Sequence, residues 1–142
     1  MLDTKGPEIR TGPKNKDDQE ISYTKGSRVE ITTDYAREND EETIACSYKE
    51  LPTSVKVGGI ILLADGALSV KVLEVKEESI FVECLNNSKF GPRKNMNLPG
   101  CVVHLPTLTE QDEKDIVDFG IANGVDMIAA SFIRKVEDIR HI

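Results

Sequence analysis

Residues 3–12 read Asp-Thr-Lys-Gly-Pro-Glu-Ile-Arg-Thr-Gly, which places two acids, two bases and two hydroxyls around a Gly-Pro bend. Glycine permits backbone conformations that other residues avoid, and proline fixes its own φ. The bend can therefore direct the polar groups before it one way and those after it another. Taken alone, such a stretch reads as an ordinary charged turn, but no local structural need explains this density of polar side chains.

The composition limits the functions that this chain can have. Its 142 residues suit one domain or parts of two, and a hydrophobic content of 39% is enough for a core. Lys and Arg number 18 against 25 Asp and Glu, so the net charge is −7, and there is no Trp. Nucleic-acid binding uses basic faces and aromatic stacking, so the composition argues against a nucleic-acid partner.

The three cysteines, Cys46, Cys84 and Cys101, are odd in number and far apart. Their spacing fits neither a disulfide framework nor a paired-cysteine metal site, and it favours buried structural thiols in a reducing compartment. No apolar run approaches the roughly 20 residues of a membrane helix, and no signal peptide is evident. We therefore expect a soluble, cytoplasmic protein that has no membrane partner.

Residues 20–97 carry the pattern of short strands. Residues 68–75 alternate apolar and polar side chains, and the mostly apolar residues 57–63 lead into the turn Asp65-Gly66. Short strands separated by Gly, Asn and Asp at intervals of roughly ten residues are typical of a small antiparallel barrel or sandwich. Asp65-Gly66 is its clearest hairpin signal.

Beyond the strand region the pattern changes to a helix and then a strand. Thr109 is a suitable N-cap with acids in the turn that follows, and an apolar stripe leads to a stop at Gly120. Residues 124–133 are almost continuously apolar, as in a parallel strand covered on both faces. Residues 135–142 resemble the start of another helix, so we expect the chain to be incomplete at both ends.

A second polar stretch, residues 91–100, reads Gly-Pro-Arg-Lys-Asn-Met-Asn-Leu-Pro-Gly. Its adjacent cations, Arg93 and Lys94, stand on a stiffened loop, where Lys can bind phosphate as a point charge and Arg as a two-pronged donor. Taken alone, this stretch reads as a solvated basic turn.

Together, the segments resemble pyruvate kinases over the whole chain. Five family motifs occur in order: Asp-Thr-Lys-Gly-Pro-Glu-Ile-Arg at 3–10, an Asp-Gly turn at 65–66, Lys-x-x-Asn-Leu-Pro at 94–99, Leu-Pro-x-Leu-Thr-x-x-Asp at 105–112 and Ala-Ser-Phe-Ile-Arg at 130–134.

The resemblance implies a mainly β fold in which a small antiparallel β-barrel, the lid or B domain, is inserted after the third strand of a TIM barrel. Residues 1–10 would end that third strand, 11–104 would form the lid, and 105–142 would run through a helix into a truncated fourth strand. Residues 3–10 and 131–134 would then lie at the carboxyl ends of barrel strands, where such barrels carry their catalytic residues.

The resemblance also implies phosphoryl transfer from phosphoenolpyruvate to ADP, giving pyruvate and ATP in glycolysis, with Mg²⁺ or Mn²⁺ and K⁺ as cofactors and a homotetrameric parent. The Asp3 side chain and the Thr4 carbonyl would bind potassium, for which hard oxygen ligands are appropriate. Arg10 and Lys94 would contact the nucleotide phosphates, and Asp65 would reach the nucleotide side when the lid closes.

Other positions carry weaker implications. Glu8 would make the enzyme depend on potassium, since family members with lysine there do without it. His104 replaces an Asp that is usual in the family, so we assign it no role, and Arg93 would be a secondary phosphate contact. The family's catalytic lysine and divalent-metal carboxylates do not occur in these 142 residues, so we expect the chain alone to be inactive.

The alternative is a stand-alone β-barrel module that binds a nucleotide or another ligand. A nucleic-acid binder with an OB fold is disfavoured by the acidic charge and the few aromatic residues. The apolar strand at 125–133 distinguishes the remaining two hypotheses, because it has no place in a free module but fits the edge of a larger barrel.

Overall fold

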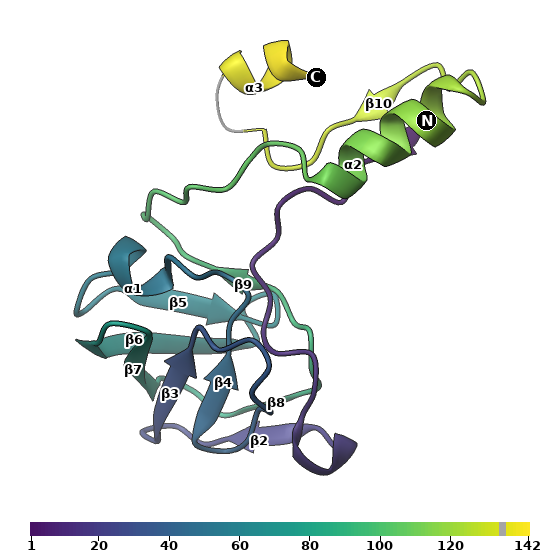
Figure 1. The fold of residues 1–142 in the computed structure, drawn as a ribbon. Helices are drawn as coiled ribbons and strands as arrows, with labels where there is room; N and C mark the ends of the chain where they lie inside the picture. The colour runs from purple at the N-terminus through teal and green to yellow at the C-terminus, as the bar shows by residue number, and fades with distance from the viewer. Residues whose placement is uncertain (134–135) are drawn as a thin grey trace. The chain divides into compact units, whose positions relative to one another are not determined.

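The computed structural model describes residues 1–133 and 136–142, which divide into two compact units (Figure 1). One unit comprises residues 9–103, and the other comprises residues 1–8 and 104–142. Arg134, which ends the last of the five motifs, lies outside the described residues.

The 9–103 unit is mainly β, as expected. Its elements are η1 (Lys16–Asp18), β2 (Ile21–Tyr23), β3 (Arg28–Thr32), β4 (Thr43–Ala45), α1 (Leu51–Ser54), β5 (Ile60–Leu63), β6 (Leu68–Val75), β7 (Ser79–Cys84), β8 (Ser88–Phe90) and β9 (Met96–Asn97). A curled six-stranded sheet has the order β4-β3-β7-β6-β5-β9, and β2 pairs with β8 in a separate sheet (Figure 1).

Residues 9–12 join the two edges of the six-stranded sheet. Arg10 forms an antiparallel bridge with Asn95, which precedes β9, and Thr11 forms one with Cys46, which follows β4. The backbone hydrogen bonds that flank these bridges measure 2.8 to 3.0 Å. The segment therefore acts as an additional strand that closes the curled sheet into a barrel.

A buried amide holds this closing segment in place. Asn39 is 2% exposed, and its Nδ2 donates to the Gly12 carbonyl at 3.2 Å and to Asn15 Oδ1 at 2.8 Å. Its Oδ1 accepts a hydrogen bond from the Ala45 amide at 2.9 Å. Asn39 therefore connects the closing segment directly to β4, and its polar atoms are satisfied although they are buried.

The core of the barrel follows the strand period. On β6, Leu68, Val70 and Val72 are buried, whereas Lys71 and Leu73 are exposed. Full burial of one such aliphatic side chain contributes about 1.5–3 kcal/mol to stability. The alternation therefore identified the inner face correctly from Leu68 to Val72, whereas Val75, beyond a register shift after Val72, is exposed.

The hairpin expected at Asp65-Gly66 is present. β5 and β6 are antiparallel, and Leu63 pairs with Leu68 across the turn. Asp65 and Gly66 have φ values of 57° and 89°, a region that glycine adopts without strain.

One strand pairing departs from the expected antiparallel pattern. β3 and β4 run parallel, with Ile31 opposite Ile44. The reason is the connection through residues 33–42, which returns the chain to the same end of the sheet before β4 begins. Strand spacing alone does not distinguish such a return from a long hairpin.

The second unit contains β1 (Leu2–Asp3), α2 (Glu110–Lys114), η2 (Asp115–Ile121), β10 (Ile128–Ala129) and α3 (Val136–His141). β1 and β10 pair in parallel, and α2 continues into η2, which is a π-helical stretch. The helix expected near the end of the chain is therefore present as α3.

The helix begins where it was expected but does not end there. Thr109 caps α2 in a capping box with Asp112, as the Thr-x-x-Asp spacing allows. Gly120 was expected to stop the helix, yet it lies inside η2, where a Cβ would come within 3.0 Å of Leu2 Cδ2. Gly124, with a φ of 62°, follows the helix instead. Packing against β1, not helix termination, explains the glycine at position 120.

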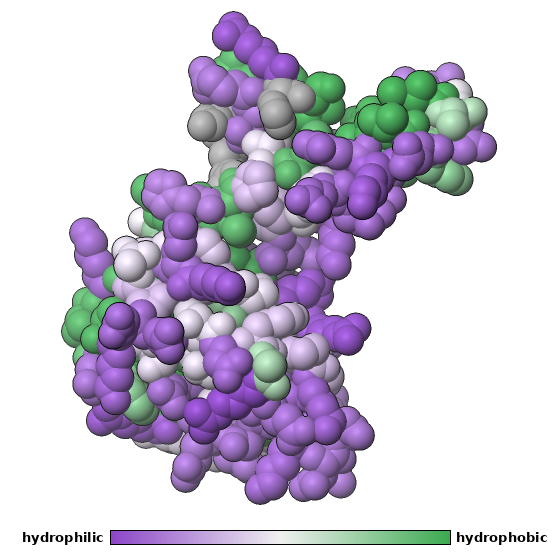
Figure 2. Space-filling model, viewed as in Figure 1, coloured by the Kyte–Doolittle hydropathy of each residue, from purple (hydrophilic) through white to green (hydrophobic). Residues whose placement is uncertain are grey.

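The apolar stretch at 124–133 pairs in parallel as expected, but it is not covered on both faces. Only Ile128–Ala129 is a strand, and Met127 and Ile128 are 62% and 38% exposed. β1 is its partner in the described part of the chain, so this partner alone cannot cover both faces. Figure 2 shows apolar surface over the carboxyl end of the α2–η2 helix, and in this part of the helix Phe119 and Ile121 are exposed.

The cysteines agree only in part with the expectation of buried thiols. Cys46 and Cys84 are buried, and burial raises the pKa of the Cys46 thiol to about 12. Cys101 is half-exposed, which corrects the expectation for that residue. A thiol with so high a pKa is unreactive at neutral pH, so Cys46 has a packing role.

Barrel closure can be tested at Gly12. A Cβ there would lie 2.5 Å from Asn39 Oδ1 and 2.9 Å from Ala45 Cβ. We expect Gly12→Ala to lower the free energy of unfolding by about 1–3 kcal/mol, as overpacking does. Urea denaturation followed by circular dichroism measures the difference.

Gly91→Ala is the matched control, because nothing within 4 Å would meet a Cβ at Gly91. We expect this variant to change the free energy of unfolding by less than about 1 kcal/mol. Equal stabilities for the two variants would contradict tight packing of residues 9–12.

Candidate functional site

The predicted potassium ligands, Asp3 and Thr4, lie at the carboxyl end of β1, beside the end of its partner strand β10. Thr4 continues the β1–β10 ladder, since its amide donates to the Ala129 carbonyl at 2.9 Å. Its Oγ1 accepts a hydrogen bond from the Ser131 amide at 3.0 Å, and Ser131 Oγ lies 3.4 Å from Asp3 Oδ1. The structure thus brings Asp3 and Thr4 together and adds Ser131 to them. Carboxylate, hydroxyl and carbonyl oxygens are a donor set that suits a hard monovalent cation.

The Gly-Pro bend follows these ligands directly. Gly6 has a φ of 69°, and a Cβ there would lie 2.6 Å from Phe132 Cδ2. Glycine is therefore required both by the backbone conformation and by the close approach of the second strand end. Glu8 follows the bend and is half-buried, and its amide donates to the Gly6 carbonyl at 3.1 Å.

Asp112 was not among the site residues predicted from the sequence, but it contacts the Gly-Pro bend. Its side chain is 1% exposed, and Oδ1 accepts hydrogen bonds from the Lys5 and Gly6 amides at 3.0 and 3.2 Å. Oδ2 accepts from the Thr109 amide at 2.9 Å and from Thr109 Oγ1 at 2.7 Å. The signals in the sequence were its place in the Leu-Pro-x-Leu-Thr-x-x-Asp motif and in the capping box, and the capping box accounts for Oδ2 but not for Oδ1.

The charge state of Asp112 follows from these contacts. Burial by itself would raise the pKa of the carboxyl, but the hydrogen bonds from Thr109, Gly6 and Lys5 favour the ionised form and lower the pKa below its ordinary value. The side chain is therefore a carboxylate at neutral pH.

In the 9–103 unit, the predicted nucleotide ligands lie on neighbouring segments: the closing segment, the residues before β9 and the β5–β6 turn. Arg10 bridges to Asn95, and the Asn95 carbonyl accepts a hydrogen bond from the Ala64 amide at 2.9 Å. Lys94 immediately precedes Asn95 in the chain, and Asp65 immediately follows Ala64. The structure therefore brings Arg10, Lys94 and Asp65 to one region of the barrel.

The backbone of Lys94 is fixed by the closing segment. Its amide donates to Thr11 Oγ1 at 2.8 Å, and its carbonyl accepts from the Thr11 amide at 2.8 Å. The Lys94 side chain is exposed, and Arg10 Nη1 donates to the Arg93 carbonyl at 2.7 Å. Two cations on a fixed backbone can bind phosphate oxygens, while the exposed carboxylate of Asp65 can accept hydrogen bonds from hydroxyl groups.

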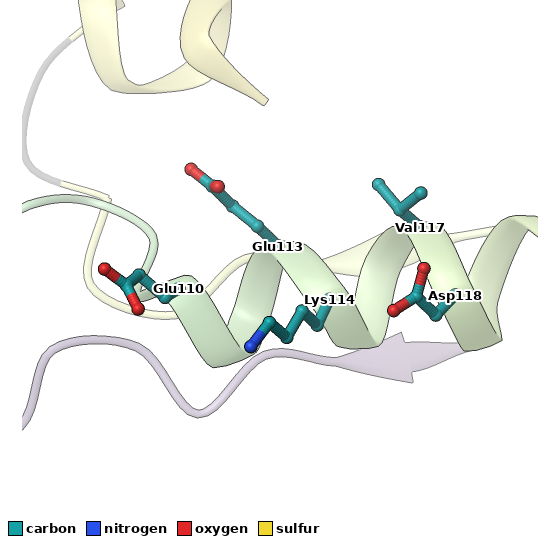
Figure 3. Close-up of a pocket in the computed structure, with 5 residues that line it drawn as sticks. All are labelled: Glu110, Glu113, Lys114, Val117 and Asp118. Atoms are coloured by element: carbon teal, nitrogen blue, oxygen red, sulfur yellow. The ribbon is translucent and has the colours of Figure 1, made fainter.

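A shallow hollow lies elsewhere, along the exposed face of the α2–η2 helix (Figure 3). Its lining residues are Glu110, Glu113, Lys114, Val117 and Asp118. It contains none of the predicted site residues. Within residues 1–133 and 136–142, no group of three or more His, Cys, Asp and Glu side chains is placed to hold a metal ion.

Comparison with known proteins shows similarity along the whole chain. Residues 1–142 match the family model described as pyruvate kinase, barrel domain. A probable pyruvate kinase, cytosolic isozyme, of Arabidopsis thaliana is 52% identical over 141 residues, which are 98% of this chain and 28% of that protein. A pyruvate kinase of Eimeria tenella is 47% identical over 142 residues, which are 100% of this chain and 27% of that protein.

Solved structures give the same result. A pyruvate kinase from Cryptosporidium parvum matches with a TM-score of 0.92 and 48% identity over 99% of this chain and 28% of its own. A structure of Cryptosporidium parvum pyruvate kinase in complex with ADP has a TM-score of 0.91 and 47% identity, over 99% and 27% of the two chains. The present chain thus spans about 28% of the length of such relatives. Its described helices are each too short or too polar to cross a membrane.

The charge of Asp112 predicts a pH dependence of stability. Because the folded-state pKa is lowered, the unfolded chain binds more protons in acid, and stability rises with pH. The contribution is fully present above the unfolded pKa of about 4 and is lost as pH falls through the lowered folded value. We expect Asp112→Asn to be less stable than wild type at pH 7 and the difference to shrink below about pH 4, as measured by thermal unfolding across pH.

Asp115→Asn is the control, since Asp115 is an exposed carboxylate on the same helix that accepts a hydrogen bond from Gln111 Nε2 at 2.7 Å. The Asp115→Asn variant should have nearly the stability of wild type, because substitutions of exposed side chains usually change the free energy of unfolding by no more than about 0.5 kcal/mol. A difference between Asp112→Asn and wild type that is constant from pH 7 into the acid range would rule out a stabilising carboxylate at position 112.

Proposed function

Because the chain belongs to the pyruvate kinase family, we propose that it is part of an enzyme that transfers a phosphoryl group from phosphoenolpyruvate to ADP, giving pyruvate and ATP in glycolysis. The observation that carries this proposal is the match over the whole chain, at 52% and 47% identity to two enzymes of that name. The stand-alone binding module is not favoured, because the similarity includes the α2–β10 region as well as the β-barrel.

The family suggests a domain assignment for this chain. Residues 1–10 would end the third strand of a TIM barrel, residues 11–104 would be the lid, and residues 105–142 would lead into the fourth strand. The compact unit at residues 9–103 supports this assignment, since its limits lie close to those of the proposed lid. Parallel pairing of β1 with β10 is also what adjacent strands of such a barrel require.

The substrates and cofactors follow from the same proposal. ADP or ATP and phosphoenolpyruvate would bind, and a related structure is named as a complex with ADP. Mg²⁺ or Mn²⁺ and K⁺ would supply positive charge to the highly charged oxygens when bound. A homotetrameric assembly and a cytoplasmic location complete the proposal, the latter supported by relatives that are named cytosolic isozymes.

Within the chain, each predicted ligand has a separate task. Asp3 and Thr4 would hold potassium through a carboxylate and a backbone carbonyl, with Glu8 making the enzyme dependent on that ion. Arg10 and Lys94 would bind nucleotide phosphates as charge moves during the transfer. Catalysis of this kind depends mainly on positioning and electrostatic stabilisation, which a fixed backbone beneath both cations supports.

The proposed activity can be tested directly. A full-length enzyme that contains this chain should convert phosphoenolpyruvate and ADP to pyruvate and ATP with a magnesium requirement, measured in an assay coupled to lactate dehydrogenase. The 142-residue chain alone should give no turnover above a buffer control, because the family's catalytic lysine and metal carboxylates are not in it. Absence of turnover from the full-length enzyme would refute the proposed function.

The phosphate contacts can be tested in the same full-length enzyme. We expect Arg10→Met or Lys94→Met to lower kcat by about 100-fold or more, which is the effect of removing one electrostatic donor. Lys89→Met is a matched control, since Lys89 is another exposed lysine of the barrel, on β8, and lies 3.6 Å from Glu20. Unchanged kinetics in both test variants would mean that these side chains are solvated charges.

A further inference from the structure

We propose that Asp112 is a positioning residue for the monovalent-cation site at Asp3 and Thr4, an inference that rests on the proposed function. Asp112 would act through the peptide group that joins Thr4 to Lys5. It is distant in sequence from this bend, by 107 residues from Lys5 and 106 from Gly6, yet it belongs to the same compact unit.

The first step of the argument is the use of both carboxylate oxygens. Oδ2 serves the start of α2 through Thr109, and this alone would satisfy a helix cap. Oδ1 serves the bend, where it accepts from the Lys5 and Gly6 amides. An ionised carboxylate is acceptor-only on both oxygens, whereas asparagine has one acceptor oxygen and an NH₂ donor. Asparagine at this position therefore cannot satisfy both sets of donors.

The second step is the geometry of the peptide group. The Lys5 amide and the Thr4 carbonyl belong to one planar unit, and no peptide bond among the described residues is cis. In a trans peptide the N–H and the C=O point in opposite directions. Because the Lys5 N–H points to Asp112 Oδ1, the Thr4 carbonyl points away from that carboxylate. The side chain of Asp112 therefore determines the direction of the proposed ligand oxygen.

The third step is that the remaining groups of Thr4 are also fixed. Its amide donates to Ala129, and its Oγ1 accepts from the Ser131 amide. The strand ladder thus holds one side of Thr4 while Asp112 holds the peptide on the other side. A negative acceptor on the Lys5 amide also polarises the peptide, which makes the Thr4 carbonyl oxygen a better cation ligand.

The experiment uses the full-length enzyme with Asp112→Asn and two controls. Asp115→Asn removes an exposed carboxylate from the same helix, and Thr109→Ala weakens the cap but leaves the Oδ1 contacts intact. Potassium chloride is exchanged for tetramethylammonium chloride at constant ionic strength, which separates site binding from screening. The increase in Tm with potassium measures binding without turnover, and the half-saturating potassium concentration for activity is the second measurement.

We expect Asp112→Asn to raise the half-saturating potassium concentration by about 10-fold or more and to reduce the potassium-dependent increase in Tm, as loss of a group that orients a metal ligand does. In both controls, the half-saturating potassium concentration should stay within about twofold of the wild-type value. Wild-type potassium affinity in Asp112→Asn would overturn the proposal. An equal loss in Thr109→Ala would also overturn it, because the effect would then be one of helix stability.

Two further outcomes keep this inference separate from the proposed function. Turnover in the wild type without any response to potassium would overturn the cation site and leave the proposed function standing. Absence of turnover with an intact potassium-dependent Tm shift would refute the function but not the site. Should Asp112→Asn fail to fold, Asp112→Glu keeps the charge but displaces the oxygens by one methylene, and wild-type potassium affinity in that variant would overturn the proposal.

Discussion

The barrel depends on the backbone hydrogen bonds of residues 9–12, which pair with both edges of the six-stranded sheet. Without them, two rows of backbone amides and carbonyls would lack partners, and buried groups of that kind are costly. The strand period then determines which side chains face the core, since Ile9 and Thr11 are buried while Arg10 between them is not. Closure of the sheet and presentation of Arg10 are therefore consequences of the same pairing.

The same pairing also fixes the backbone of Lys94, the other proposed phosphate ligand. Thr11 binds both backbone groups of Lys94, so the exposed lysine stands on a segment with little freedom. In the second unit, Thr4 is held in a similar way by Ala129 and Ser131. In each unit a charged side chain proposed to bind a ligand, Asp3 or Lys94, is exposed, whereas the backbone beside it is fixed. Such an arrangement lowers the entropy lost when a charged ligand is bound.

Local chemistry made part of this structure predictable from the sequence. The β5–β6 hairpin needed only the Asp-Gly turn and the strand period, and the start of α2 needed only Thr109 as an N-cap with acids in the turn that follows. The grouping of Asp3 with Thr4 followed from their adjacency, but the grouping of Arg10 with Lys94 and Asp65 was expected only from the family motifs.

Features that depend on distant segments could not be predicted in this way. Gly120 is required by its contact with Leu2, and the second oxygen of Asp112 binds a bend that lies more than 100 residues earlier. The parallel pairing of β3 with β4 and the exposure of Met127 are likewise tertiary outcomes. Periodicity reports which side of an element is apolar, but it does not report which partner covers that side.

Native-state hydrogen exchange at the closing segment tests the central claim most directly. The amides that make the two bridges belong to Thr11, Gly12, Ser47 and Met96. If residues 9–12 close the barrel, these amides should exchange as slowly as those of the core strands β6 and β7, through global unfolding of the barrel. Exchange as fast as that of exposed loop amides, with β6 and β7 still protected, would show that the barrel is stable without this segment and would contradict the account.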